Sequence, residues 1–149
     1  SAAPTAPGRP QPMAPPIIRQ VKKHAGTEGV TIIDVSPGTS CPVVEAVKGS
    51  DFCLLVTEPT PFGLNDLRLA VETARELGLP HGVIINRVGV GDARTEDYCR
   101  DEGIPVLMTI PLDERIARSY SRGVTLLEAL PEYRARFLAL YERIEELVA

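Results

Sequence analysis

One acidic residue stands where an apolar run meets a turn. Residues 30–35 are rich in β-branched side chains, include Asp34, and are followed by Pro37 and Gly38. A buried parallel strand delivers residues in this way to the carboxyl edge of its sheet, where α/β folds bind ligands. A carboxylate in that position commonly orients Mg²⁺ and water around a nucleotide phosphate. We therefore expect Asp34 to serve a phosphate-bearing ligand.

Three later apolar runs also end in polar or turn-forming residues. They end at residues 57–63, at Asn86 and at residues 109–113. In a doubly wound sheet such ends face one crevice. The amide of Asn86 both donates and accepts hydrogen bonds, which suits the edge of a purine, although asparagine also often ends a strand as a turn residue. Asp113 has an alternative role as the N-cap of a helix that begins at Glu114.

Other chemistries find little support. The three cysteines, Cys41, Cys53 and Cys99, are odd in number and form no CxxC pair, which argues against a disulfide framework and against a closed metal site. A reducing, cytoplasmic compartment fits them best. Cys41 begins a helix, where it is either a stabilised thiolate or a small residue in a tight turn. His24 and His81 lack ligand spacing.

Composition narrows the classes of partner. The chain has 149 residues, enough for about one domain, and a net charge of −4. Its one basic cluster, at residues 22–24, is too short to indicate nucleic-acid binding. No apolar run reaches the length of a membrane span, and the first residues lack the layout of a signal peptide. We expect a globular domain without a nucleic-acid or membrane-spanning role.

Strand and helix signals alternate along most of the chain. Residues 1–16 contain six prolines and predict a linker or tail, whereas residues 17–149 predict the domain. Short β-branched runs predict strands at 31–35, 52–57, 82–86 and 106–110. Amphipathic stretches predict helices at 17–24, 42–48, 64–77, 95–101, 114–122 and 131–148. The predicted fold is α/β, a doubly wound and mostly parallel sheet with helices on both faces.

Four segments together resemble the C-terminal half of MinD/ParA-like P-loop ATPases, of the cobyrinic acid a,c-diamide synthase type. The resemblance is nearest to the MinD-superfamily ATPases that carry an inserted ferredoxin domain. Residues 32–43, IIDVSPGTSCPV, resemble the Walker B strand and switch II loop, and residues 55–67, LVTEPTPFGLNDL, the next strand and helix. Residues 83–87, VIINR, resemble the adenine-contacting motif, and residues 104–113, IPVLMTIPLD, the last strand with its base-flanking loop.

The resemblance implies roles for the matched positions. Asp34 would hold the water shell of Mg²⁺, and the Pro37-Gly38 turn would approach the γ-phosphate of ATP. Asn86, with Arg87 beside it, would contact adenine. The base would be bordered by a loop of three residues, Pro111, Leu112 and Asp113.

Two departures accompany the resemblance. Ser36 stands where many relatives have the first proline of the switch. These 149 residues also contain neither a Gly-rich loop with a phosphate-binding lysine nor a cysteine-rich ferredoxin segment. We therefore expect the C-terminal part of an ATPase that uses ATP and Mg²⁺, inactive by itself because phosphoryl transfer depends on cradling the phosphates. An iron–sulfur cluster would belong only to the absent insert.

Expected partners are ATP, a second copy of the chain or a missing N-terminal half, and an iron–sulfur protein. An alternative is a non-catalytic module for dimerisation or regulation that retains the fold. A third reading, a doubly wound phosphoacceptor that uses Asp34, is weakened because no acidic pair precedes Asp34 and no lysine ends a later strand.

Overall fold

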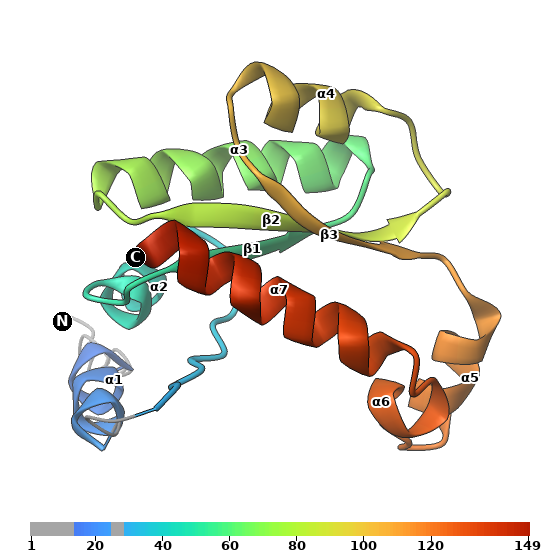
Figure 1. Cartoon of the computed structure of the whole chain (residues 1–149). Helices are drawn as coiled ribbons and strands as arrows, with labels where there is room; N and C mark the ends of the chain where they lie inside the picture. Colours follow the sequence, from blue (N-terminus) through green and yellow to red (C-terminus); the bar gives the residue numbers. More distant parts are fainter. Residues whose placement is uncertain (1–13, 25–28) are drawn as a thin grey trace, which may run out of the picture. The chain divides into compact units, whose positions relative to one another are not determined.

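The computed structural model describes residues 14–24 and 29–149, and the chain divides into two compact units, Ser1–Lys48 and Gly49–Ala149. Figure 1 labels the helices and strands of both units. Most of the segment predicted as a linker, residues 1–13, lies outside the described residues.

The first unit contains two short helices, α1 (Ala14–Lys23) and α2 (Cys41–Val47). Helix α1 begins three residues before the predicted start at Ile17, so Pro15 and Pro16 lie in its first turn. Proline is tolerated there because the first amides of a helix have no intrahelical acceptor, and its fixed φ already suits a helix. Helix α2 follows Ser40 at the N-cap and has Pro42 near its start, as the sequence predicted.

The predicted strand at residues 31–35 does not form, and this prediction was wrong. The segment has no regular secondary structure, and the side chain of Ile32 is 88% exposed. A strand persists only where its amide and carbonyl groups pair with a neighbour. None of the described residues pairs with this segment, so its β-branched pattern does not produce a strand.

The second unit is built on a parallel sheet of three strands in the order β1-β2-β3. They are β1 (Cys53–Thr57), β2 (His81–Val88) and β3 (Val106–Pro111), which confirms the other three predicted strands. Register places Thr57 beside Ile85 and Asn86 beside Ile110. The crossovers contain α3 (Pro61–Glu76) and α4 (Arg94–Asp101). The α/β class and the parallel sheet are thus confirmed.

Helices cover both faces of this sheet (Figure 1). Because side chains alternate along a strand, Val83 and Ile85 face one way and Ile84 the other. The first face packs against α3 and α4 through a buried cluster of Leu67, Val71, Val83, Ile85, Cys99 and Ile104. The second packs against α7 (Tyr133–Val148) and the segment before it through Ile84, Met108, Leu130, Tyr133 and Leu140.

Two further helices join β3 to α7. Helix α5 (Glu114–Ser121) is close to its prediction, whereas α6 (Leu126–Ala129) was not predicted. Helix α6 has a capping box, in which the side chain of Thr125 accepts from the amide of Glu128 and the Glu128 carboxylate accepts from the amide of Thr125. Such reciprocal capping allows a helix of one turn to persist. Among the described residues no helix is both long and apolar enough to span a membrane.

Candidate functional site at the carboxyl edge of the sheet

The loop between β1 and α3 is held by short polar contacts. The Thr57 hydroxyl donates to the Gly63 carbonyl at 2.9 Å, and the Gly63 amide donates to the Thr60 hydroxyl at 3.0 Å. Gly63 has no room for a side chain, since a Cβ there would lie 2.4 Å from the carbonyl oxygen of Glu58. The loop after β1 is therefore fixed in shape, and its two ends approach each other closely at Gly63.

The end of β2 contains a bulge. Asn86 pairs with Ile110 and Val88 with Pro111, so Arg87 is an extra residue without a partner on β3. Arg87 has φ of 58°, and it is the one non-glycine residue with positive φ among those the structure describes. Bulges of this kind redirect side chains and are frequent beside functional sites.

Contacts across the edge join the ends of the three strands. An Arg87 Nη1 lies 3.4 Å from a Glu58 carboxylate oxygen, so the ends of β2 and β1 are bridged by an exposed ion pair. Gly91, in the loop after β2, approaches so closely that a Cβ would collide with the Pro59 carbonyl. The Leu112 amide donates to the Val88 carbonyl at 3.0 Å, which connects β3 to β2. The three loops consequently form one packed surface.

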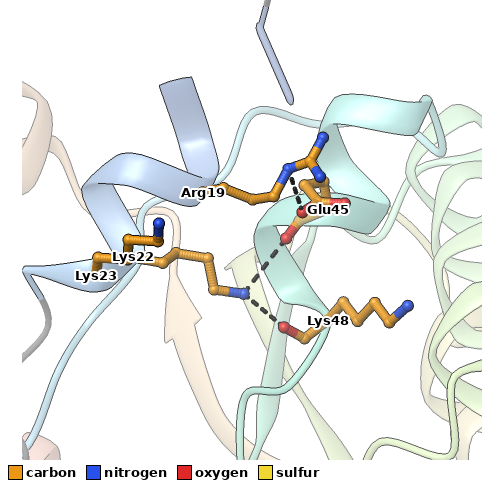
Figure 2. Close-up of a pocket in the computed structure, with 5 residues that line it drawn as sticks. All are labelled: Arg19, Lys22, Lys23, Glu45 and Lys48. Carbon is orange, nitrogen blue, oxygen red and sulfur yellow. Dashed lines mark hydrogen bonds and ion pairs between the residues drawn. The ribbon is translucent and has the colours of Figure 1, made fainter. Parts of the chain in front are cut away.

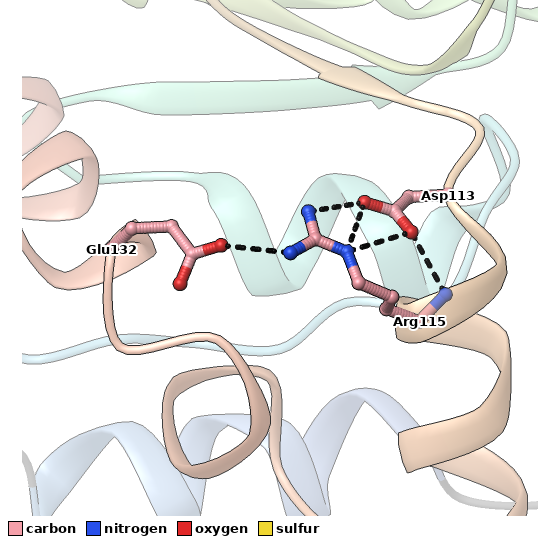
Figure 3. A network of polar contacts seen from close by, with 3 residues as sticks. All are labelled: Asp113, Arg115 and Glu132. Atoms are coloured by element: carbon pink, nitrogen blue, oxygen red, sulfur yellow. Dashed lines mark hydrogen bonds and ion pairs between the residues drawn. The ribbon is translucent and has the colours of Figure 1, made fainter.

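The carboxylate of Asp113 caps α5, which confirms the helix-cap alternative for this residue. It accepts from the Arg115 amide at 2.8 Å and from Nη2 of the same residue at 2.7 Å (Figure 3). The other Nη of Arg115 donates to Glu132 at 3.3 Å. The side-chain and backbone hydrogen bonds from Arg115 lower the pKa of Asp113 below its ordinary value. Asp113 thus keeps its charge, but Arg115 occupies much of its accepting capacity.

Two other predicted base-border residues precede Asp113. Pro111 is the last residue of β3, and Leu112 follows it with a side chain that is 56% exposed. Together with Asn86 and Arg87 they lie at the carboxyl ends of β2 and β3, as the sequence predicted. The ends of β2 and β3 thus supply an exposed leucine and a half-buried amide, the two kinds of group that small-molecule sites combine.

The remaining predicted residues, Asp34, Pro37 and Gly38, belong to the first unit. Asp34 is exposed, and its carboxylate makes no hydrogen bond or ion pair with any residue that the structure describes. Gly38 has φ of 120°, and a Cβ built on it would meet nothing within 4 Å. A lone accessible carboxylate fits an ion held through water, but no group of three or more metal-ligating side chains occurs among the described residues.

A basic hollow of about 320 Å³ lies between α1 and α2, inside the first unit (Figure 2). The ammonium of Lys22 donates to carbonyls at the end of α2, namely those of Glu45, Ala46 and Lys48. Arg19 pairs with the Glu45 carboxylate at 3.2 Å. A cation at this position offsets the partial negative charge of a helix C-terminus. These contacts join the two helices. The sequence reasoning noted the basic cluster but not this role.

The sequence reasoning also missed the Glu58–Arg87 pair and the bulge. The available signal was an acid just after one strand and an arginine at the end of the next, because parallel neighbours bring such residues to one edge. Cys41 is exposed at the start of α2.

No protein-family model matches the chain. Two uncharacterized proteins of Methanocaldococcus jannaschii are similar to it. MJ0579 is 32% identical over 75% of this chain and 39% of its own length, and MJ0578 is 25% identical over 89% and 46%. The chain therefore spans less than half the length of the curated relatives it matches.

Two solved structures have folds similar to that of this chain. The cell division ATPase MinD of Pyrococcus furiosus matches with a TM-score of 0.58 and 28% identity, over 74% of this chain and 48% of its own. The septum site-determining protein MinD of Pyrococcus horikoshii, solved in complex with Mg-ADP, matches with a TM-score of 0.68 and 24% identity, over 91% and 57%.

The parallel sheet and its covering helices are those of a P-loop NTPase-like α/β fold. Within that class the chain is related to the MinD-like ATPases, as the sequence resemblance implied.

Proposed function

We propose that this chain is the C-terminal, nucleotide-binding part of a MinD-like P-loop ATPase and that it supplies the adenine side of the site. The observation that carries this proposal is the packed edge of the sheet, where Asn86, Arg87 and Leu112 lie at adjoining strand ends. The resemblance of the same segments to the MinD family and the match to a MinD protein bound to Mg-ADP support it.

On the second unit, Asn86 would hydrogen-bond the base and Leu112 would cover part of its apolar face. Pro111 fixes the backbone of the flanking loop. Asp113 would border the base through its place in the loop, because its carboxylate is already held by Arg115. The base side would therefore consist of rigid backbone and the amide nitrogen of Asn86.

On the first unit, Asp34 would hold Mg²⁺ through water, and the Pro37-Gly38 turn would approach the terminal phosphate. The open surroundings of Gly38 and the Asp34 carboxylate, which is unpaired among the described residues, support this assignment. When bound, Mg²⁺ would neutralise phosphate charge during hydrolysis. Asp34 and the turn would orient its water shell.

The phosphate cradle would come from residues outside this chain. Relatives are about twice as long, and these residues contain no Gly-rich loop with a lysine. The outer edge of β1 has room for another strand. Among the described residues β1 pairs only with β2, and its Val56 side chain is 65% exposed. The N-terminal half of the protein is the partner that fits this edge. Without it we expect negligible turnover.

The wider setting follows from the family resemblance. ATP would drive association of two copies of the whole protein, which would act on a partner, and an iron–sulfur protein is the partner that the resemblance implies. The three cysteines are free thiols, which favours a reducing, cytoplasmic compartment.

The test is nucleotide selectivity of the chain itself. We expect Mg-ADP to bind with a Kd of about 1 mM, and about fivefold more tightly than Mg-UDP, because only one good hydrogen bond reads the base. Asn86→Ala should remove that preference. Asn65→Ala, a change of the same kind at an exposed position of α3, should retain it. Equal binding of both nucleotides to the unchanged chain would overturn the proposal.

The exposed β1 edge also favours a second function, a non-catalytic module for dimerisation or regulation. Leu54 and Val56 place apolar side chains on one face of a strand with an open edge. A chain that forms a tight dimer in sedimentation experiments, and shows no nucleotide preference, would support this alternative.

A further inference from the structure

Arg87 occupies a backbone conformation that side chains with a Cβ rarely adopt. Its φ of 58° lies in the left-handed region, which is the usual place of glycine. Residues held there by their surroundings concentrate at functional sites. The conformation belongs to the bulge, since Arg87 is the residue that β3 leaves without a partner.

The bulge determines which atom of the Asn86 amide forms a hydrogen bond within the protein. The backbone N–H of Arg87 donates to Oδ1 of Asn86 at 3.0 Å. A backbone N–H can only donate, so the amide atom that receives it must be the oxygen rather than the nitrogen. The orientation of this side chain therefore follows from chemistry.

The other end of the amide is left for a ligand. Nδ2 of Asn86 makes no hydrogen bond to any residue that the structure describes. No buried side-chain nitrogen or oxygen in that part of the chain lacks a partner, so Nδ2 is accessible to solvent. The edge of the sheet consequently presents an amide donor in a fixed direction.

The ion pair between Arg87 and Glu58 contributes less to this arrangement than the backbone does. Its shortest N–O distance is 3.4 Å, and both side chains are more than 40% exposed. Exposed pairs of this length are weak. The hydrogen bond that orients Asn86 comes from the Arg87 main chain, so the left-handed backbone must carry most of the effect.

We propose that Arg87 is a positioning residue whose left-handed backbone turns Nδ2 of Asn86 toward the ligand, so that the site selects a purine ring nitrogen that accepts a hydrogen bond. This rests on the proposed nucleotide function and adds to it the polarity of the contact. The amide oxygen is shared with Arg87, so the ligand must offer an acceptor to the nitrogen.

The experiment compares adenosine with its 1-deaza, 3-deaza and 7-deaza analogues, in which one ring nitrogen becomes C–H. In the unchanged chain, one analogue should bind about fivefold more weakly than adenosine, because the donor loses its acceptor. Arg87→Gly keeps φ positive and should retain that difference. Arg87→Val, which disfavours positive φ, should reduce it to less than twofold. Glu58→Gln, which removes only the ion pair, should retain it.

Two outcomes would overturn the inference. One is equal binding of all four ligands by a chain that binds adenosine, and the other is full discrimination by Arg87→Val. A readout without ligand separates this inference from the proposed function. NMR couplings should show one χ1 rotamer for Asn86 in the unchanged chain and in Arg87→Gly, and averaging in Arg87→Val. One rotamer without any adenosine binding would refute the nucleotide function and leave the positioning role of Arg87 supported.

Discussion

The end of β2 and the segment at residues 31–35 have similar sequences and different structures. Both are β-branched runs with a polar residue at or near the end, Asn86 in one and Asp34 in the other. In the second unit the run is buried on both faces and paired with β1 and β3. In the first unit the run has no strand beside it among the described residues, and Ile32 is exposed. A strand sequence thus becomes a strand only when neighbours supply its hydrogen bonds.

The comparison predicts a large difference in stability effects. Ile85→Ala removes a fully buried side chain from the core under α3 and α4, and should lower the free energy of unfolding by about 2–5 kcal/mol. Ile32→Ala should change it by less than about 0.5 kcal/mol, because the side chain is already in water. Urea unfolding followed by circular dichroism measures both. Similar losses at the two positions would show that residues 31–35 are buried in solution.

A smaller effect is expected in the closely packed loop between β1 and α3. Gly63→Ala places a methyl group against the Glu58 carbonyl and should cost about 1–3 kcal/mol, since the loop has to shift. Asn65→Ala, two residues further along α3, should be neutral or slightly stabilising. Thermal unfolding compares the two. A Gly63→Ala protein as stable as the unchanged chain would show that this loop is loose.

The smallest predicted effect concerns the charge at the end of β3. Asp113 has a lowered pKa in the folded state, so its contribution is present above the unfolded value and is lost as the pH falls through the folded value. Arg115→Gln should raise the pKa of Asp113 toward 3.8, its ordinary value, and move this loss to higher pH. NMR titration of the Asp113 carboxyl group measures this pKa. An unchanged pKa of Asp113 in Arg115→Gln would show that the Arg115 side chain does not cause the lowered value.

Short sequence patterns predicted the three strands of the sheet and the cap of α5. The runs that became β1, β2 and β3 were recognised because both faces are apolar, and Asp113 was recognised as a cap because a helix begins directly after it. The Thr125-x-x-Glu128 capping box was visible in the sequence but was not used, so α6 was missed.

The other errors share one physical cause, which is pairing between distant segments. Whether residues 31–35 form a strand depends on a neighbour that a single run cannot reveal. The bulge at Arg87 arises from the register between β2 and β3, and its contact with Glu58 joins residues 29 positions apart. Asn86 was predicted as a site residue from its position, but its orientation needed the structure.

The central claim is that this chain contains the base side of a nucleotide site without a phosphate cradle. The most direct test compares adenosine with Mg-ADP on the unchanged chain, by NMR titration of the Asn86 side-chain amide. We predict Kd values of about 1 mM for both ligands, within about threefold of each other, because the phosphates gain little without a cradle. Micromolar binding of Mg-ADP, or no response of Asn86 to adenosine, would contradict the account.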